Sequence, residues 1–238
     1  MVRVLKPKTY SVTKDMTLEI DMRKHPAWDF TVTVAAGVQL DVVWLGNNLK
    51  KSVCPAIHFM LREKARLRLA LSVSRSHEAS VRSSIKLIGS GAEAYVSGLF
   101  HGFGHDRHIL DVAVHHQASN TKGDILIRGV YEDTAYGRFS GLLKIHPGAN
   151  QTNSYFVDNV LLLDRGMATS IPTLEILAND VRATHGSTTS RVNDDQLFYL
   201  KSRGLSTHQA VQHIIRGFFQ PILARLPANA EKLFSHSL

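Results

Sequence analysis

Short strand signals recur along most of this chain, and no helical period of any length separates them between residues 54 and 190. From Ile85 to Tyr155 the candidate strands begin roughly 9 to 16 residues apart, which is typical of repeated short strands. Turn signals such as Gly89-Ser90-Gly91 and Pro147-Gly148 fall between them. This pattern predicts an all-β core, and it leaves a sandwich, a barrel and a β-solenoid open.

The pattern changes from strand to helix near residue 193. Asp194 is a candidate N-cap, and Gly204 lies where a helix would stop. Ser206 and Gln209 then form a capping box at the start of a second helix. An apolar stripe at helical spacing follows, made of Ala210, Val211, Ile214, Ile215, Phe218 and Phe219. The stripe either packs on the end of the β core or docks a partner, and both can hold on opposite faces of the helix.

These two patterns divide the chain into a β core and a helical tail. We expect the core over residues 1–192, with residues 1–50 as N-terminal cap strands, and the α-helical segment over residues 193–238. A hydrophobic share of 44% supports a sizeable core. No window approaches about 18 uninterrupted apolar residues, so we expect no membrane span. The first residues also lack the apolar run of a secretion signal.

The formal net charge of the chain is +8, which raises the question of a nucleic-acid partner. The basic residues are scattered, however, and the densest local sets are Lys50-Lys51 and Arg62 to Arg68. No long basic run is interleaved with aromatic residues. The pattern therefore favours a solvated basic surface over a nucleic-acid site.

Four motifs follow one another between residues 172 and 204: Pro-x-Leu-Glu-Ile, Asn-Asp-Val, His-Gly and Asp-Gln-Leu-Phe-Tyr-Leu-x-Ser-Arg-Gly. In this order they resemble the SufB/SufD family of iron–sulfur cluster assembly scaffolds, and the resemblance extends from about Ser83 to about Phe219. It implies that the all-β core is a right-handed parallel β-helix. The open ends of such a solenoid need capping, and their exposed strands can pair with another chain.

His185 lies among small hydroxylated residues, Thr184 to Thr189, which we expect to form a polar loop. A neutral imidazole is a good iron ligand, and it can relay protons near pH 7. The alternative is an exposed structural histidine. The resemblance places this histidine at the interface between SufD-like and SufB-like chains, where the nascent cluster forms. We therefore predict that His185 acts at a cluster-assembly interface and binds metal there.

Two departures from the family pattern point to the SufD side. SufB-like chains place a Glu directly after the matching histidine, whereas this chain has Gly186. SufB-like chains also carry a Cys roughly six residues before the matching proline, a place that Gly166 occupies here. The resemblance is therefore SufD-like.

Cys54 is the only cysteine, so no internal disulfide can form, which fits a reducing, cytoplasmic compartment. An iron–sulfur cluster usually needs about four Cys ligands. We therefore expect no stably bound cofactor, and only a transient cluster at an interface shared with another chain. Cys54 lies far from the motifs, and we expect it to be a buried small hydrophobe.

Other candidate sites are less specific. The histidines from His101 to His116 have spacings that resemble those of zinc ligands, but along strands these spacings do not gather side chains on one face, so hydrogen-bonded or solvent-facing histidines are the alternative. Glu132-Asp133 is a carboxylate pair whose members would face opposite ways in a strand. The chain has no Gly-x-Ser-x-Gly and no phosphate loop ending in Gly-Lys-Ser/Thr, so we expect it not to hydrolyse ATP.

The resulting hypothesis is a non-catalytic scaffold subunit of a Suf-type iron–sulfur assembly complex. The resemblance implies two partners: a SufB-like chain or a second copy of this one, and a SufC-like ABC ATPase that docks the C-terminal helices through Ile214 and Phe218. We expect no nucleic acid and no membrane partner. Two alternatives remain open, a self-associating scaffold that replaces both SufB and SufD, and a β-helix carbohydrate-active enzyme, which would need clustered carboxylates in a groove.

Overall fold

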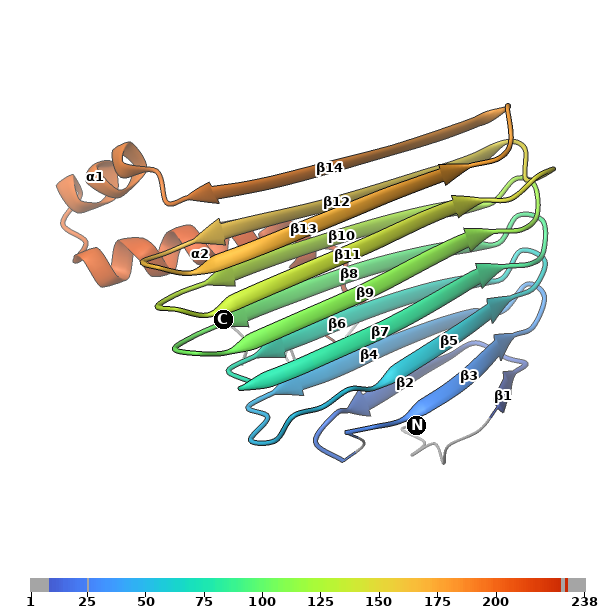
Figure 1. The fold of residues 1–238 in the computed structure, drawn as a ribbon, viewed down its shortest axis with the longest axis horizontal. Coiled ribbons are helices and arrows are strands. Elements are labelled where there is room, and N and C mark those ends of the chain that lie inside the picture. Colours follow the sequence, from blue (N-terminus) through green and yellow to red (C-terminus); the bar gives the residue numbers. More distant parts are fainter. Residues whose placement is uncertain (1–8, 25, 228–229, 231–238) are drawn as a thin grey trace.

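The computed structural model describes residues 9–24, 26–227 and 230, and in it the chain forms a β-solenoid followed by two helices (Figure 1). Odd- and even-numbered strands form two separate sheets of seven strands, which we call the odd sheet and the even sheet. The odd sheet contains β1 (Thr9–Val12), β3 (Asp29–Val34), β5 (Ala56–Leu61), β7 (Glu78–Leu87), β9 (Arg107–His116), β11 (Tyr136–Ile145) and β13 (Met167–Ile176). The even sheet contains β2 (Met16–Asp21), β4 (Gln39–Asn47), β6 (Arg66–Ser74), β8 (Glu93–Gly102), β10 (Lys122–Tyr131), β12 (Thr152–Leu162) and β14 (Val181–Arg191).

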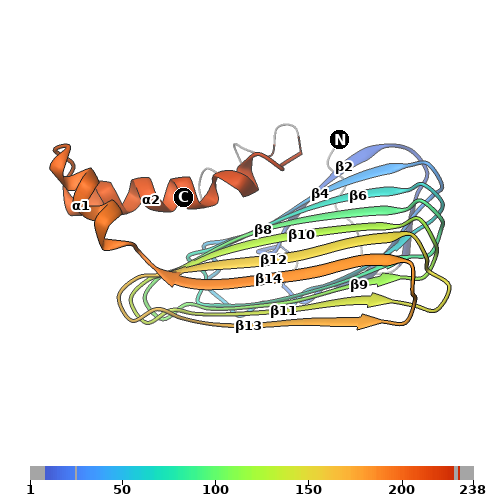
Figure 2. The same ribbon diagram turned by 90° about the horizontal axis from the view of Figure 1, so that it is seen from above.

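Strands that follow one another in the chain lie in opposite sheets, so each odd–even pair makes one coil that stacks on the coil before it (Figure 2). Every strand pairs in parallel with the strand two places away, as β12 does with β10 and with β14. Successive strands of a hairpin-built sandwich would instead pair with each other. The prediction of a parallel β-helix with a C-terminal helical segment is confirmed.

The first strands belong to the same solenoid as the later ones. β2 pairs in parallel with β4, and β3 pairs in parallel with both β1 and β5. The segment that the sequence suggests as N-terminal cap strands therefore continues the two sheets in the part of it that the structure describes.

The core lies between the two sheets and is filled by every second residue of each strand. In the middle coils many of these inward residues are large and apolar, because each is covered by the coil above and the coil below. Phe100, Tyr131 and Phe139 are fully buried. The rings of Phe100 and Phe139 meet edge to face with centroids 5.2 Å apart, a favourable arrangement of two aromatic rings.

Aspartates in the turns connect successive coils. Asp133 and Asp164 have left-handed φ values of 54° and 49°, a conformation that Asp adopts more readily than most residues. The carboxylate of Asp133 accepts a hydrogen bond from the backbone N–H of Gly104 in the preceding turn, at 2.9 Å. The turns therefore stack in the same order as the strands.

Two helices follow β14. In α1 (Asp194–Ser202) the N-cap is Asn193, whose side chain accepts hydrogen bonds from the N–H groups of Asp195 and Gln196. The expectation of Asp194 as N-cap was therefore wrong by one residue, because Asp194 already has helical geometry and Asn caps as well as Asp does. In α2 (Thr207–Leu223) the capping box of Ser206 and Gln209 is confirmed.

The α2 helix lies along the outer face of the even sheet (Figure 2). Ile215, Phe219 and Ile222 are fully buried against outward residues of the sheet such as Leu99 and Val130. At its C-terminal end, the guanidinium of Arg225 forms an ion pair with Asp124 on β10 at 2.8 Å. One face of the apolar stripe thus packs on the solenoid, but on the outer face of the even sheet and not on the end of the β core, where the first interpretation placed it.

Arg128 on β10 ties the middle of α2 to the sheet. Its guanidinium carbon lies 4.8 Å from the centre of the Phe218 ring, and Nη1 donates a hydrogen bond to the Phe218 carbonyl oxygen. Burial lowers the pKa of Arg128 from its ordinary value.

Pro221 lies inside the α2 helix, which nevertheless continues to Leu223. None of the helices in the part of the chain that the structure describes is both long and apolar enough to cross a membrane.

Candidate functional site

The last coil of the solenoid, β13 and β14, has no further coil on top of it among the described residues. β13 pairs only with β11, and β14 pairs only with β12, so each presents a free edge (Figure 1). Large apolar side chains gather on this coil and just after β13, with Met167 at 55% and Leu177 at 50% exposure, together with Ile171 and Ile176. An unpaired strand edge beside an exposed apolar surface is typical of a protein–protein interface.

His185 lies in the middle of β14, not in a loop. The expected polar loop from Thr184 to Thr189 is therefore wrong, because these residues pair in register with β12 from Tyr155 to Val160. Small hydroxylated residues are typical of turns, but a strand at the end of a solenoid also needs no apolar face. Threonine is β-branched and suits strands, so the backbone pairs as a strand while its side chains remain polar.

The register gives the direction of the His185 side chain. His185 pairs with Phe156, which is 1% exposed and points into the core. The same inward column holds, from the first even strand onward, Leu18, Val42, Leu69, Val96, Ile125 and Phe156. His185 thus replaces an apolar core residue at the end of its column, and its side chain is exposed because no described part of the chain covers it.

We call the inward-facing positions of β13 and β14 the mouth of the solenoid. Besides His185 they include Ser170 and Ser187. Just beneath them lies Asp158 on β12, which is completely buried and accepts a hydrogen bond from the hydroxyl of Ser170. Sequence reasoning missed Asp158. The sequence did carry a signal: Asp158 comes two residues after Phe156 in a strand whose residues alternate between core and surface, so it faces the core.

A second candidate surface lies where α1, α2 and the ends of β12 and β14 meet. These elements enclose a cavity of about 900 Å3 whose lining includes Tyr199, Ile214 and Phe218. Ile214 and Phe218 are partly buried, and both pack against the apolar cluster under α2. The most exposed large apolar residue on these helices is Phe198, at 75%, followed by Tyr199, at 56%. The sequence pointed to the α2 stripe for docking and missed these two α1 residues.

The comparisons with known proteins agree on one family. Residues 29–218 match the model described as "SUF system FeS cluster assembly, SufBD core domain". The chain belongs to the SufBD family. It is 32% identical over 216 residues to the iron–sulfur cluster assembly SufBD family protein ML0594 of Mycobacterium leprae, covering 85% of this chain and 55% of that protein.

Two further relatives carry related names. The SufBD family protein Rv1462 of Mycobacterium tuberculosis is 30% identical over 210 residues, covering 83% of this chain and 52% of that protein. The iron–sulfur cluster assembly protein SufD of Bacillus subtilis is 29% identical over 169 residues, covering 71% of this chain and 39% of that protein. The chain therefore spans about half, or less, of the length of these relatives.

The two glycines at which the chain departs from the SufB-like pattern have different surroundings. A Cβ at Gly166 would lie 2.2 Å from the backbone carbonyl oxygen of Tyr131, so a cysteine cannot occupy this position unless the backbone shifts. A Cβ at Gly186 would meet only Val157, at 4.0 Å. In this SufBD chain the absence of a cysteine at position 166 is thus required by packing, whereas the absence of a side chain at position 186 is not.

His101, His108 and His116 each contact a hydrogen-bond partner within the protein. His101 pairs with Glu132 at 2.7 Å, and His108 bonds the carbonyl oxygen of Ser76 at 3.0 Å. His116 lies 3.0 Å from the hydroxyl of Ser154. Burial lowers the pKa of both His108 and His116 to about 4, so these two imidazoles are neutral at pH 7. Within the described ranges, no group of three or more His, Cys, Asp or Glu residues is placed to hold a metal ion.

Cys54 is exposed, so the expectation of a buried small hydrophobe was wrong. It precedes Pro55 in the segment before β5 and thus lies outside the inward–outward alternation of a strand. The guanidinium of Arg82 donates a hydrogen bond to the sulfur of Cys54, with Nη2 3.6 Å away. Glu132 and Asp133 also lie in a turn and face separate partners, His101 and the Gly104 N–H.

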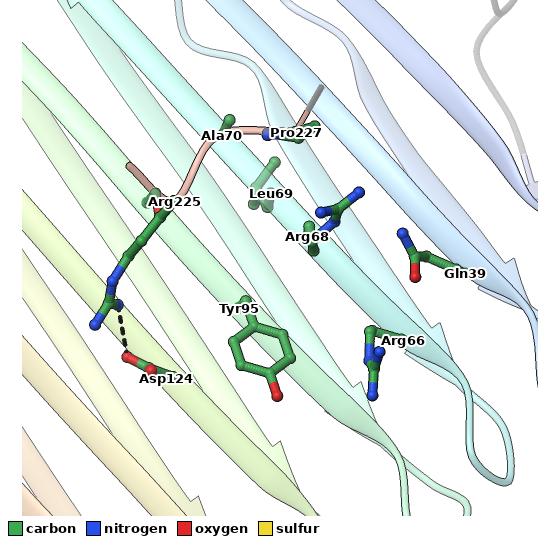
Figure 3. Close-up of a pocket in the computed structure, with 10 residues that line it drawn as sticks. Gln39, Arg66, Arg68, Leu69, Ala70, Tyr95, Asp124, Arg225 and Pro227 are labelled. Carbon is green, nitrogen blue, oxygen red and sulfur yellow. Dashed lines mark hydrogen bonds and ion pairs between the residues drawn. The ribbon is translucent and has the colours of Figure 1, made fainter. Parts of the chain in front are cut away.

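Three arginines that line a cavity on the even sheet are each paired with a carboxylate. A cavity of about 380 Å3 beneath the end of α2 is lined by Arg66, Arg68 and Arg225 (Figure 3). Arg66 contacts Glu93 and Arg225 contacts Asp124, each at 2.8 Å, while Arg68 makes a two-bond contact with Asp41. Because each guanidinium already pairs with a carboxylate, the positive charges of this cavity are neutralised within the protein, and we do not interpret the cavity as an anion site.

Proposed function

We propose that this chain is a non-catalytic scaffold subunit of a Suf-type iron–sulfur assembly complex and that it works in the cytoplasm. One observation carries the proposal: the last coil replaces an apolar core residue by His185 and leaves it uncovered between free strand edges. Membership of the SufBD family supports the assembly role. In this role the chain holds no stable cofactor, and a transient cluster forms where the mouth meets another chain.

The first partner is a SufB-like chain or a second copy of this one, bound at the last coil. Exposed backbone groups on β13 and β14 favour strand pairing, and Met167 and Ile171 offer apolar area to be buried. A partner at this end would enclose His185, and a SufB-like chain would also supply the thiolates that this chain, with one cysteine, lacks. This arrangement explains why the inner columns that reach His185 and Ser187 end in polar residues.

The second partner is a SufC-like ATPase on the C-terminal helices. Phe198 and Tyr199 form the exposed apolar surface, while Ile214 and Phe218 line the cavity beside it. We assign all four residues to the docking site. Replacing Phe218 also removes its stacking with Arg128, so variants at Phe198 and Tyr199 give the cleaner test.

A crossed pair of variants tests the two surfaces. We expect Phe198→Asp/Tyr199→Asp to abolish co-purification of the ATPase while leaving the scaffold partner bound. Met167→Asp/Ile171→Asp should do the reverse, because charge at a buried apolar contact is costly. Both variants should remain folded by circular dichroism, since all four side chains are exposed. If either variant loses both partners or neither, the assignment of the surfaces is wrong.

Co-purification also decides between a heteromeric and a self-associating scaffold. If the Met167→Asp/Ile171→Asp variant turns a homodimer into a monomer in the absence of any SufB-like chain, the second copy is the partner.

Cluster formation by the reconstituted complex should fall in His185→Ala and stay unchanged in His58→Ala, a half-exposed histidine on β5, far from the last coil. Full cluster formation by His185→Ala would overturn the proposed role of this residue.

A further inference from the structure

Two inner columns of the solenoid become polar in their last strands. One column of the even sheet holds, in successive coils, Ile20, Trp44, Leu71, Gly98 and Ile127. Asp158 occupies the next position and Ser187 the last. Across the core, one column of the odd sheet holds Val81, Leu110 and Phe139 and then ends in Ser170. Both columns therefore become polar in the strands next to the open end.

Asp158 has an incomplete set of hydrogen bonds. Its side chain has no solvent exposure, and the hydroxyl of Ser170 donates to Oδ2. Oδ1 is buried and has no hydrogen-bond partner among the residues that the structure describes. A carboxylate oxygen in this position is costly, and it is retained in folded proteins where a cation or a donor completes it.

Two further donor groups lie next to Asp158. Ser187 pairs with Asp158 in register, and His185 lies two residues before Ser187 on the same face of β14. Adjacent strands lie about 4.8 Å apart and a parallel strand rises about 3.3 Å per residue, so Ser187 is about 5 Å and His185 about 8 Å from Asp158 across the pair. The carboxylate, the Ser187 hydroxyl and the long imidazole side chain are thus within reach of one small ion in the mouth.

We propose that Asp158 is an oxygen ligand for a ferrous ion that enters the mouth, and that His185 and Ser187 complete the part of the site that this chain supplies. The inference rests on the proposed function, in which iron is the cargo. Carboxylate and imidazole ligands suit ferrous iron, and the unpaired Oδ1 is the observation that fits such a cation. Ser170, bonded to the other oxygen, fixes the orientation of the carboxylate, as partners of metal ligands commonly do.

The competing role for Asp158 is purely structural, and Asp158→Asn separates the two. The asparagine keeps the shape and an oxygen for Ser170 to donate to, but it removes the buried charge. If Asp158 serves only stability, this change should lower the melting temperature. If it is a ligand left incomplete in the free chain, the variant should melt at the same temperature as the natural chain or higher.

Metal binding by the purified full chain provides the main test. Titration with Co2+, a spectroscopic substitute for ferrous iron, followed by anaerobic titration with Fe2+, should show reversible binding of one ion per chain. We expect Asp158→Asn to weaken binding at least tenfold and His185→Ala to do the same. Asp111→Asn is the matched control, since Asp111 lies on a strand but faces outward and pairs with Arg138 at 2.6 Å. It should bind the ion as the natural chain does.

The outcomes separate this inference from the proposed function. No binding by the natural chain, or equal binding by Asp158→Asn, would overturn the ferrous site, even if the chain still joins its partners and supports cluster formation. A chain that binds Co2+ through Asp158 yet joins no scaffold partner and no ATPase would instead overturn the proposed function. A drop in melting temperature for Asp158→Asn with unchanged Co2+ binding would assign Asp158 a structural role.

Discussion

The middle coils and the last coil of this solenoid share one backbone arrangement but use their inward positions differently. In the middle, Ile125 and Phe156 are covered on both sides and stabilise the stack by burial. At the end, His185 occupies the same column with nothing above it. A repeat protein gains stability from each pair of neighbouring coils, so a coil with one neighbour is freer to carry reactive side chains.

The largest expected effect comes from a middle-coil aromatic residue. Phe139→Ala should lower the free energy of unfolding by about 3–5 kcal/mol, because Phe139 is fully buried and its ring packs on Phe100 and Tyr131. Ile171→Ala on the last coil, at 44% exposure, should cost less than about 1 kcal/mol. Denaturant unfolding of both variants makes the comparison. Equal losses would mean that the last coil is as tightly packed as the middle ones.

A pH dependence should arise from the buried histidines. The pKa of His116 is lowered to about 4 from the ordinary 6.5, mainly by burial. At pH values between these two, this histidine is protonated in the unfolded chain and neutral in the folded chain. Stability is therefore complete above pH 6.5 and falls as the pH drops toward 4. Between pH 7.5 and pH 5.0 this histidine should contribute a loss of about 2 kcal/mol.

His116→Gln is the variant that isolates this contribution, since it removes the titrating group. Free energies of unfolding measured at pH 7.5 and pH 5.0 should differ by about 2 kcal/mol less in the variant than in the natural chain. His108, whose pKa is also lowered to about 4, should behave in the same way. An unchanged difference in His116→Gln would show that this histidine is already protonated in the folded protein.

Two glycines give a smaller effect. Gly166→Ala should destabilise the chain by about 1–3 kcal/mol, because the new Cβ would lie 2.2 Å from the carbonyl oxygen of Tyr131. Gly186→Ala, with only Val157 at 4.0 Å, should change stability by less than about 0.5 kcal/mol. Melting curves of the two variants test this difference. If alanine at position 166 leaves stability unchanged, the backbone of the turn before β13 can shift at little cost in free energy.

The sequence was sufficient to predict the solenoid, and the structure shows why. Short strands at regular spacing, without a helical period, follow from coils that each contribute one strand to each sheet. The capping box of α2 was also readable, because Ser206 and Gln209 act within one helical turn. Features that depend on neighbours within a few residues, or on a repeat along the chain, can therefore be predicted from the sequence.

Features decided by the stacking of distant coils were not accessible. The strand around His185 reads as a loop because its small polar residues resemble a turn, and only pairing with β12 makes it a strand. Asp158 passed unnoticed because its importance depends on the apolar column below it and on Ser170 opposite, twelve residues away. The usual burial of cysteines predicts a buried Cys54, but its place beside Pro55, just before β5, leaves it exposed.

The smallest stability effect and the most specific functional effect are expected at the same residue. His185→Ala should change the free energy of unfolding by no more than about 0.5 kcal/mol, because the side chain is exposed on a coil with no covering neighbour. His185→Cys keeps a metal-binding side chain and should retain more cluster formation than His185→Ala if ligation is the role. Equal loss in both variants would favour proton transfer. A fall in melting temperature that parallels the loss of assembly would instead make His185 a structural residue, and the contrast between the middle coils and the last coil would no longer hold at this position.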